Sequence, residues 1–195
     1  MKNNYIELFV PGRLCLVGEH SDWAGKYRSQ NNNIEKGYAI VTGINEGIYA
    51  CENATVINNI VEVNESATGI KIGSDNVLVV NNSITAENGY GIDIQGNNAR
   101  ITNNNITSSG SNGIYLKGQY NGIIIDDNKI ISNKDGILFK QQTRTKKTNN
   151  VYVDKNTIIS DADYAINFEE AGAYNAIDVN VTVTSSNVLS SSFVL

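Results

Sequence analysis

Two aspartates, Asp126 and Asp154, are the residues whose type and spacing first suggest chemistry. Both occupy the same place in a repeating segment. Their carboxylates are therefore expected to face each other about one strand spacing apart, with Asp127 beside them. Two facing carboxylates can hold a Ca²⁺ ion. The alternative, which we favour, is that they repel each other on a solvated face while the adjacent Lys155 offsets their charge.

A basic run and an acidic run form a second candidate site, in this case for binding. Residues 140–148 are the most basic stretch of an acidic chain, and residues 169–174 are expected to project from the corresponding corner of the next repeat. Adjacent loops of opposite charge more often pair with each other than bind a ligand, and we favour the pairing. A surface-binding role stays open for Lys140, Arg144, Lys146, Lys147, Glu169, Glu170 and Tyr174.

Four tyrosines are candidates for contact with sugar rings. We expect their side chains to be exposed, and an aromatic ring can stack on the apolar face of a sugar. They are Tyr115, Tyr120, Tyr152 and Tyr174.

The elements that must position these residues come from an internal repeat. A glycine that precedes an apolar strand recurs at steps of 22, 22, 22 and 23 residues, and Ala165 takes the next place after a step of 29. We expect these glycines to supply positive φ at a corner. Apolar residues alternate with polar ones ahead of each Asn-x-Ile segment, and this period of two is typical of strands. The glycines are Gly47, Gly69, Gly91, Gly113 and Gly136, and the alternating pairs are Val77/Val79, Ala99/Ile101, Ile123/Ile125, Val151/Val153 and Val181/Val183.

Asparagines two places before the isoleucine of each repeat are expected to form a ladder. Stacked at the strand spacing of ~4.8 Å, their amides can bond one another and the turning backbone. Asparagine also tolerates the left-handed conformation that a sharp corner requires. The predicted members are Asn58, Asn82, Asn104, Asn128 and Asn156.

This pattern resembles the right-handed parallel β-helix of pectate-lyase-like and adhesin-like proteins. Two or three short strands in ~22 residues cannot bury their faces alone, whereas coils stacked on one another bury a continuous apolar column. We therefore predict an all-β fold: a right-handed parallel β-helix, or solenoid, of about six coils over residues 45–195. Residues 1–44 would form a separate N-terminal segment that serves as a cap.

The N-terminal segment carries a pattern of its own. Residues 6–10, 14–17 and 38–42 read as strands. The run from Pro11 to Trp23 is Pro-Gly-Arg-Leu-Cys-Leu-Val-Gly-Glu-His-Ser-Asp-Trp. This run resembles the N-terminal signature of GHMP kinases, closest to the galactokinase-like sugar kinases, and the resemblance extends over residues 9–50. Cys15 stands where that signature has Asn, and Trp23 where it has Tyr.

The kinase resemblance implies ATP-dependent phosphorylation of a galactose-like sugar, with ATP and Mg²⁺ as cofactors only in that case. It places Glu19, His20 and Asp22 on sugar hydroxyls and Arg13 beside the transferring phosphoryl group. Such kinases also need a Gly/Ser-rich phosphate loop that opens a helix, an acidic base and a C-terminal domain, and we find none of these in the sequence. We therefore favour a kinase-derived remnant that now acts as a cap.

Composition limits the partners. The formal net charge of −5 argues against a nucleic-acid-binding surface. We find no apolar stretch of the ~18 residues that a membrane span needs, and no signal-peptide h-region. Read literally, the chain stays in the cytoplasm, although β-helix repeats of this type are commonly extracellular; localisation therefore stays open. A C-terminal coil without a polar cap would favour self-association.

Three functions follow as hypotheses. We favour a non-catalytic β-helix module that binds carbohydrate or another surface and needs no cofactor. The first alternative is the sugar kinase. The second is a polysaccharide lyase or hydrolase, which is weakened because the repeats contain no histidine.

Overall fold

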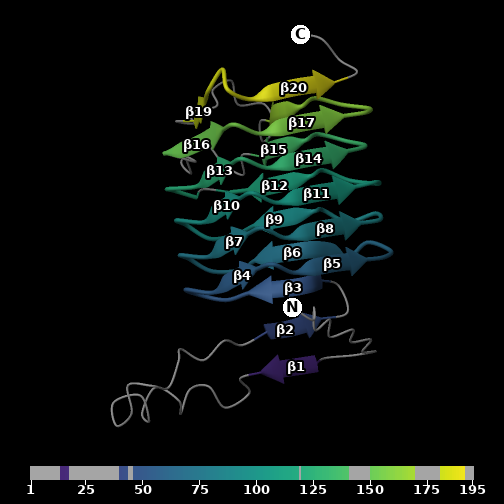
Figure 1. Cartoon of the computed structure of the whole chain (residues 1–195), viewed down its shortest axis with the longest axis vertical. Helices are drawn as coiled ribbons and strands as arrows, with labels where there is room; N and C mark the ends of the chain where they lie inside the picture. The colour runs from purple at the N-terminus through teal and green to yellow at the C-terminus, as the bar shows by residue number, and fades with distance from the viewer. Residues whose placement is uncertain are drawn as a thin grey trace, which may run out of the picture.

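The computed structural model describes residues 14–17, 40–43, 46–118, 120–140, 150–169 and 181–191, the first two ranges as backbone only. Six coils are stacked along one axis, and each coil contributes one strand to each of three sheets (Figure 1). Neighbouring strands from β3 onward are parallel, and β1 and β2 are antiparallel additions to the first sheet. The predicted all-β parallel β-helix of about six coils is therefore confirmed.

The strands of each sheet follow the stacking order of the coils. Sheet A contains β1 (Leu14–Val17), β2 (Ile40–Gly43), β3 (Glu46–Ala50), β6 (Thr68–Ile72), β9 (Ile92–Ile94), β12 (Ile114–Lys117), β15 (Ile137–Lys140) and β18 (Ile166–Glu169). Sheet B contains β4 (Thr55–Ile57), β7 (Leu78–Val80), β10 (Arg100–Thr102), β13 (Ile124–Asp126), β16 (Val151–Asp154) and β19 (Val181–Val183). Sheet C contains β5 (Ile60–Val63), β8 (Ser83–Ala86), β11 (Asn105–Ser108), β14 (Lys129–Ser132), β17 (Thr157–Ser160) and β20 (Val188–Ser191).

The core is a column of branched apolar side chains, one layer per coil. In sheet B, Val79, Ile101 and Ile125 are paired in register and fully buried. In sheet C, Ile84, Ile106 and Ile130 form the equivalent buried column. Because the register never slips between coils, every inward position meets an inward position on the next coil. Sequence alternation therefore predicted the core residues of sheet B correctly in coils 2 to 5, whereas in coil 6 Val181 is half-buried and Val183 is exposed.

The repeated glycines have a different role from the one expected. None of the five has positive φ; the described glycines with positive φ are Gly118 and Gly122. A Cβ on Gly91 would instead overlap the Ile106 side chain of sheet C and lie 2.6 Å from the carbonyl oxygen of Gly113. The prediction of positive φ was wrong, because these glycines allow two strands of adjacent coils and an isoleucine to approach closely.

The asparagine ladder is confirmed, with its first member corrected and one member added. Its buried or half-buried amides belong to Asn59, Asn82, Asn104, Asn128, Asn156 and Asn187. Asn59 replaces Asn58 because Val61, not Ile60, points inward in coil 1: Val61 is 6% exposed and Ile60 is 68% exposed. The left-handed φ lies one residue earlier, for example at Asn103, and not on the ladder amide itself.

In a ladder amide, both the Oδ1 atom and the Nδ2 atom form hydrogen bonds. The Oδ1 atom of Asn104 accepts the backbone N–H of Asn82 at 2.9 Å and its Nδ2 at 3.0 Å. The Nδ2 atom of Asn104 donates to the carbonyls of Val79 and Thr102 and to Oδ1 of Asn128 at 3.0 Å. The ladder therefore satisfies backbone groups at a buried corner where regular strand pairing is interrupted.

The N-terminal strands extend sheet A at its first edge. Strand β2 pairs antiparallel with β3, and β1 pairs antiparallel with β2. These strands agree with two of the three expected, at residues 14–17 and 38–42, and the one expected at residues 6–10 lies outside the described residues. The division into a cap at residues 1–44 and a solenoid at 45–195 stays a prediction.

Replacing Gly91 with alanine tests the close approach. We expect Gly91→Ala to lower the free energy of unfolding by about 1–3 kcal/mol, because the new methyl group overpacks the core. Chemical denaturation would measure it. Ala165→Gly, at the equivalent place in coil 6, is the control and should cost no more than about 1 kcal/mol. Equal stability of Gly91→Ala and the parent chain would contradict this role.

Replacing Asn104 with alanine tests the ladder. The change removes the acceptor of the buried Asn82 N–H and the Nδ2 donor to the buried Val79 carbonyl, so we expect a loss of about 2–4 kcal/mol in unfolding free energy. Asn103→Gly, at the exposed left-handed position next to it, should change stability by less than about 0.5 kcal/mol. Similar losses in the two variants would contradict a special role of the buried amide, since glycine keeps the left-handed corner and Asn103→Gly removes only an exposed side chain.

Candidate functional site

The turn that leads from sheet B to sheet C carries three columns of outward-facing side chains, and we name this surface the B–C corner. One column ends sheet B, one occupies the left-handed position of the turn, and one begins sheet C. The left-handed column consists of Asn58, Asn81, Asn103, Asp127 and Lys155. Because the coils are in register, chemistry that is separated by more than 20 residues in sequence becomes adjacent here.

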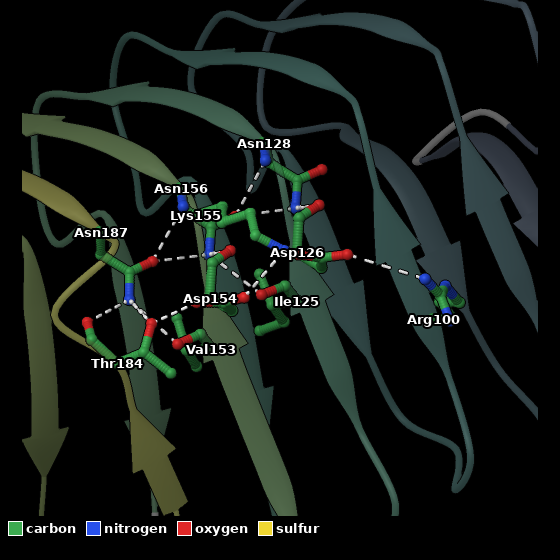
Figure 2. Close-up of polar contacts among 10 residues, drawn as sticks. All are labelled: Arg100, Ile125, Asp126, Asn128, Val153, Asp154, Lys155, Asn156, Thr184 and Asn187. Carbon is green, nitrogen blue, oxygen red and sulfur yellow. Dashed lines mark hydrogen bonds and ion pairs between the residues drawn. The ribbon is translucent and has the colours of Figure 1, made fainter.

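Asp126 and Asp154 lie side by side in the column that ends sheet B, as predicted, since they are register partners of β13 and β16. Figure 2 shows how their charge is compensated. Arg100 Nη2 lies 3.6 Å from Oδ2 of Asp126, and Lys155 Nζ lies 3.2 Å from Oδ2 of Asp154. The Thr184 hydroxyl donates to Oδ1 of Asp154. Oδ1 of Asp126 is buried and has no partner.

The titration of this pair follows its contacts. The Thr184 hydroxyl and then the Lys155 ammonium hold the pKa of Asp154 below its usual value, and Asp154 in turn raises the pKa of Lys155. The Lys155 contact matches the favoured interpretation, but the pair does not lie on a solvated face as expected, because Asp154 is buried and Asp126 is half-buried. Within the described ranges, no group of three or more His, Cys, Asp or Glu side chains is placed to hold a metal ion. A Ca²⁺ site at Asp126 and Asp154 would have two carboxylates as ligands, and it stays a prediction.

An exterior ladder of amides runs up the left-handed column and is interrupted at Asp127. Asn81 Nδ2 donates to Oδ1 of Asn58 at 2.7 Å, and Asn103 Nδ2 donates to Oδ1 of Asn81 at 3.4 Å. Asp127 follows in the column, and its carboxylate has no N–H to donate to Asn103. Among the described residues, nothing donates to the Oδ1 atom of Asn103 or to the Asp127 carboxylate.

A shallow open groove lies across this interruption. Ladder members Asn82 and Asn104 lie at its floor, and its exposed lining is Asn81, Ser83, Asn103, Asn105, Asp127 and Lys129. In the described part of the chain, the hydroxyl of Ser83 and the ammonium of Lys129 make no hydrogen bond or ion pair. The groove therefore presents donors and acceptors that are free to meet a ligand.

The pairing that we favoured between the basic run and the acidic run is observed for the one pair of these residues that the structure describes. Lys140 Nζ lies 2.6 Å from Oε1 of Glu169. The other members of this candidate surface, Arg144, Lys146, Lys147, Glu170 and Tyr174, lie outside the described residues. A binding role for them stays a prediction.

Two of the three described tyrosines that were expected to be exposed are not. Tyr115 is buried because it lies between Asp93 and Leu138 on the outer face of sheet A, and its ring stacks on Tyr90 at 4.3 Å between centroids. Burial and the adjacent Tyr90 raise its pKa far above the usual range. Tyr120 is half-buried, and Tyr152 is exposed as predicted.

The same face holds a carboxylate that the sequence did not single out. Asp93 is buried, its Oδ2 accepts Nε2 of Gln95 at 2.6 Å, and its Oδ1 has no partner. Burial raises the pKa of Asp93, against smaller opposing effects of Gln95 and Lys71. The only signal in the sequence is the position of Asp93, which alternates with inward-facing isoleucines on its strand. Its register partners on the neighbouring strands are Lys71 and Tyr115.

A family comparison agrees with this geometry. A family described as "Right handed beta helix region" matches residues 42–194. The chain belongs to this family. No curated protein and no solved structure matches the chain. The β-helix resemblance is thereby confirmed, including the segment from 42 to 50 that the kinase resemblance also covers.

The kinase resemblance gains no support. The matched family accounts for residues 42–194, and Arg13, Glu19, His20 and Asp22 lie outside the described residues. A sugar site built from these four therefore rests on sequence similarity alone.

The described residues include no helix that is long and apolar enough to cross a membrane.

The raised pKa of Asp93 gives a pH test. A raised folded-state pKa means that the stabilising contribution is present below the unfolded pKa of about 3.9 and is lost as pH rises through the folded value. We expect Asp93→Asn to raise the free energy of unfolding relative to the parent chain at pH 7, with a difference that shrinks toward pH 3. Denaturation at several pH values measures it, and the exposed Glu62→Gln is the control. A stability penalty at pH 7 would show instead that the carboxylate has an essential partner.

Proposed function

We propose that this β-helix is a non-catalytic module that binds carbohydrate in the groove of the B–C corner. The observation that carries the proposal is the interruption of the exterior amide ladder. In the coils that precede Asp127, the exterior asparagine amides hydrogen-bond to one another. At Asp127, the Oδ1 atom of Asn103 and the Asp127 carboxylate receive no donor from the described residues. The adjacent Lys129 adds a free donor.

The kind of group in the groove favours a hydroxyl-rich ligand. Amide, hydroxyl, carboxylate and ammonium groups lie on neighbouring coils, so both donors and acceptors are available at short intervals. Each sugar hydroxyl can donate one hydrogen bond and accept others, which suits such a mixed set. One carboxylate and one ammonium are present, and their opposite charges favour neither an anionic nor a cationic chain.

An exposed aromatic ring supports the same ligand class. Tyr152 is 41% exposed on β16, two residues before Asp154. An exposed tyrosine offers a flat apolar surface with a polar tip, which suits the alternating character of a sugar ring. A chain that lies along the corner could contact both the groove and this ring.

The polysaccharide-active alternative is less well supported. Its best acidic pair, Asp126 and Asp154, is already engaged by Arg100, Lys155 and Thr184. General acid–base work on a glycosidic bond requires carboxyl groups that can exchange protons with the substrate. Release of new reducing ends or unsaturated products from a polysaccharide would favour this alternative over simple binding.

Binding and its location can be tested together. The parent chain is screened on an array of neutral and acidic glycans, and a hit is titrated by calorimetry. We expect Asp127→Ala and Lys129→Ala each to weaken binding about tenfold, the scale of one or two hydrogen bonds to a charged group. Lys117→Ala, which removes an exposed lysine from sheet A, should leave the affinity unchanged.

Three outcomes would overturn the proposal. An array without any hit contradicts carbohydrate binding itself. A hit whose affinity is unchanged in the Asp127 and Lys129 variants contradicts the groove, and an equal loss in Lys117→Ala would indicate non-specific binding through charge.

A further inference from the structure

Three Asn-Gly dipeptides occur in the chain, and their surroundings differ. They are Asn88-Gly89, Asn112-Gly113 and Asn121-Gly122. Asparagine is a thermolabile residue, because its side-chain amide can react with the backbone nitrogen of the next residue. Glycine at that next position leaves the nitrogen unshielded, since it has no side chain. The reactivity of each dipeptide therefore depends on what holds the amide and that nitrogen.

Two of the dipeptides are held by residues of an adjacent coil. Asn112 is 6% exposed, and its Oδ1 atom accepts the backbone N–H of Asp135 at 3.0 Å. The backbone N–H of Gly113 donates to the carbonyl oxygen of Asp135 at 3.0 Å, so the attacking nitrogen is also occupied. Asn121 is exposed, but its Oδ1 atom accepts Nδ2 of Asn150 at 2.8 Å. A partner at Oδ1 therefore fixes the orientation of both amides.

Asn88-Gly89 is held in neither way. It lies in the turn between β8 and β9, where the side chain of Asn88 is exposed and its backbone N–H donates to the carbonyl oxygen of Glu65 at 2.9 Å. Within the part of the chain that the structure describes, neither the side-chain amide of Asn88 nor the backbone N–H of Gly89 has a hydrogen-bond partner. The turn therefore leaves both reacting groups free.

Packing between coils requires the glycine that makes Asn88 reactive. A Cβ atom on Gly89 would overlap the carbonyl oxygen of Ala67, which belongs to the preceding turn of the same corner. The carbonyl oxygen of Gly89 accepts the hydroxyl of Ser108 at 2.8 Å from the following coil. A larger residue at position 89 would overpack this contact. The solenoid itself therefore places an unshielded backbone nitrogen next to an exposed asparagine amide.

We propose that Asn88 is a site of spontaneous deamidation. The backbone nitrogen of Gly89 attacks Cγ of Asn88 and forms a new C–N bond, while the bond between Cγ and Nδ2 breaks. Ammonia leaves with the proton that the Gly89 nitrogen gives up, and a succinimide ring remains. A solvent water molecule then adds to either ring carbonyl and opens the ring to aspartate or isoaspartate, without oxidation or reduction. The site is separate from the groove of the B–C corner and does not rest on carbohydrate binding.

The two products differ in their effect on the turn. Aspartate at position 88 adds a negative charge beside Glu87, whose Oε2 atom accepts the backbone N–H of Glu65 at 3.2 Å. Because these side chains are exposed, the added charge has little effect on stability. Isoaspartate adds a methylene group to the main chain and displaces Gly89, which has no room to move toward Ala67. The isoaspartate form is therefore the less stable of the two.

Peptide mapping of the folded chain tests the site. Cleavage after lysine and arginine places the three dipeptides in separate peptides, residues 72–100, 101–117 and 118–129. After incubation at mildly alkaline pH, the peptide that contains Asn88 should gain the mass of an NH2-to-OH exchange at that residue. We expect this gain to be at least tenfold faster than at the Asn-Gly sites of the other two peptides, which must first open locally. In denaturant the three rates should become similar.

Three results would overturn the proposal. The first is no mass gain at Asn88 in the folded chain over a time that converts it in denaturant. The second is an equal rate at all three sites in the folded chain. The third is a faster reaction at Asn88 that persists in denaturant, because the local sequence and not the fold would then set the rate.

Variants separate the modification from its effect on stability. Asn88→Gln keeps an amide on a longer side chain, so it should abolish the mass gain and leave the unfolding temperature unchanged. Asn121→Gln is the matched control: it removes the other exposed Asn-Gly asparagine and should leave the reaction at Asn88 unchanged. Asn88→Asp should unfold with the parent chain, whereas the isoaspartate form, separated by chromatography, should unfold at a lower temperature. An isoaspartate form as stable as the parent chain would contradict the predicted effect on the turn.

Discussion

Stacking of coils in unbroken register is the constraint on which the rest of this structure depends. A strand of three to five residues is too short to be stable alone, so its backbone groups and its apolar face are satisfied only by the coils before and after it. The buried asparagine ladder extends this satisfaction to the B–C corner, where Asn104 Oδ1 receives two donors from Asn82 and its amide nitrogen donates onward to Asn128. The glycines serve the same constraint by removing a side chain where Gly91 passes Ile106.

The same register produces the surface chemistry. Each outward position becomes a column, and the identity of a column changes where one coil departs from the pattern. In the left-handed column, asparagines give way to Asp127 and then to Lys155, and the exterior ladder stops there. On the outer face of sheet A, the column passes from Lys71 through Asp93 to Tyr115, which leaves a buried carboxylate oxygen without a partner. A departure from an otherwise regular repeat is therefore where ligand chemistry should be sought in such a fold.

The last described coil shows how the burial of inward-facing side chains depends on the coils on either side. In the middle coils an inward isoleucine such as Ile106 is fully buried, because coils lie on both sides of it. In coil 6 the equivalent Leu189 is half-exposed, since no strand among the described residues lies on its outer side. A solenoid therefore concentrates its unsatisfied surface at its last coils, whereas its lateral faces can vary with little effect on the core.

The repeat of glycines, asparagines and alternating apolar residues was enough to predict the fold class, the number of coils, the inward columns and the pairing of Asp126 with Asp154. These follow from the sequence because a period of two and a period of about 22 residues each have one geometric solution. Other properties were decided by the tertiary structure. The ladder begins at Asn59 and not Asn58, Tyr115 is buried, Oδ1 of Asp93 lacks a partner, and the glycines relieve contacts between coils. Each of these depends on what a neighbouring coil places beside a residue, and a single coil read along the chain does not contain that information.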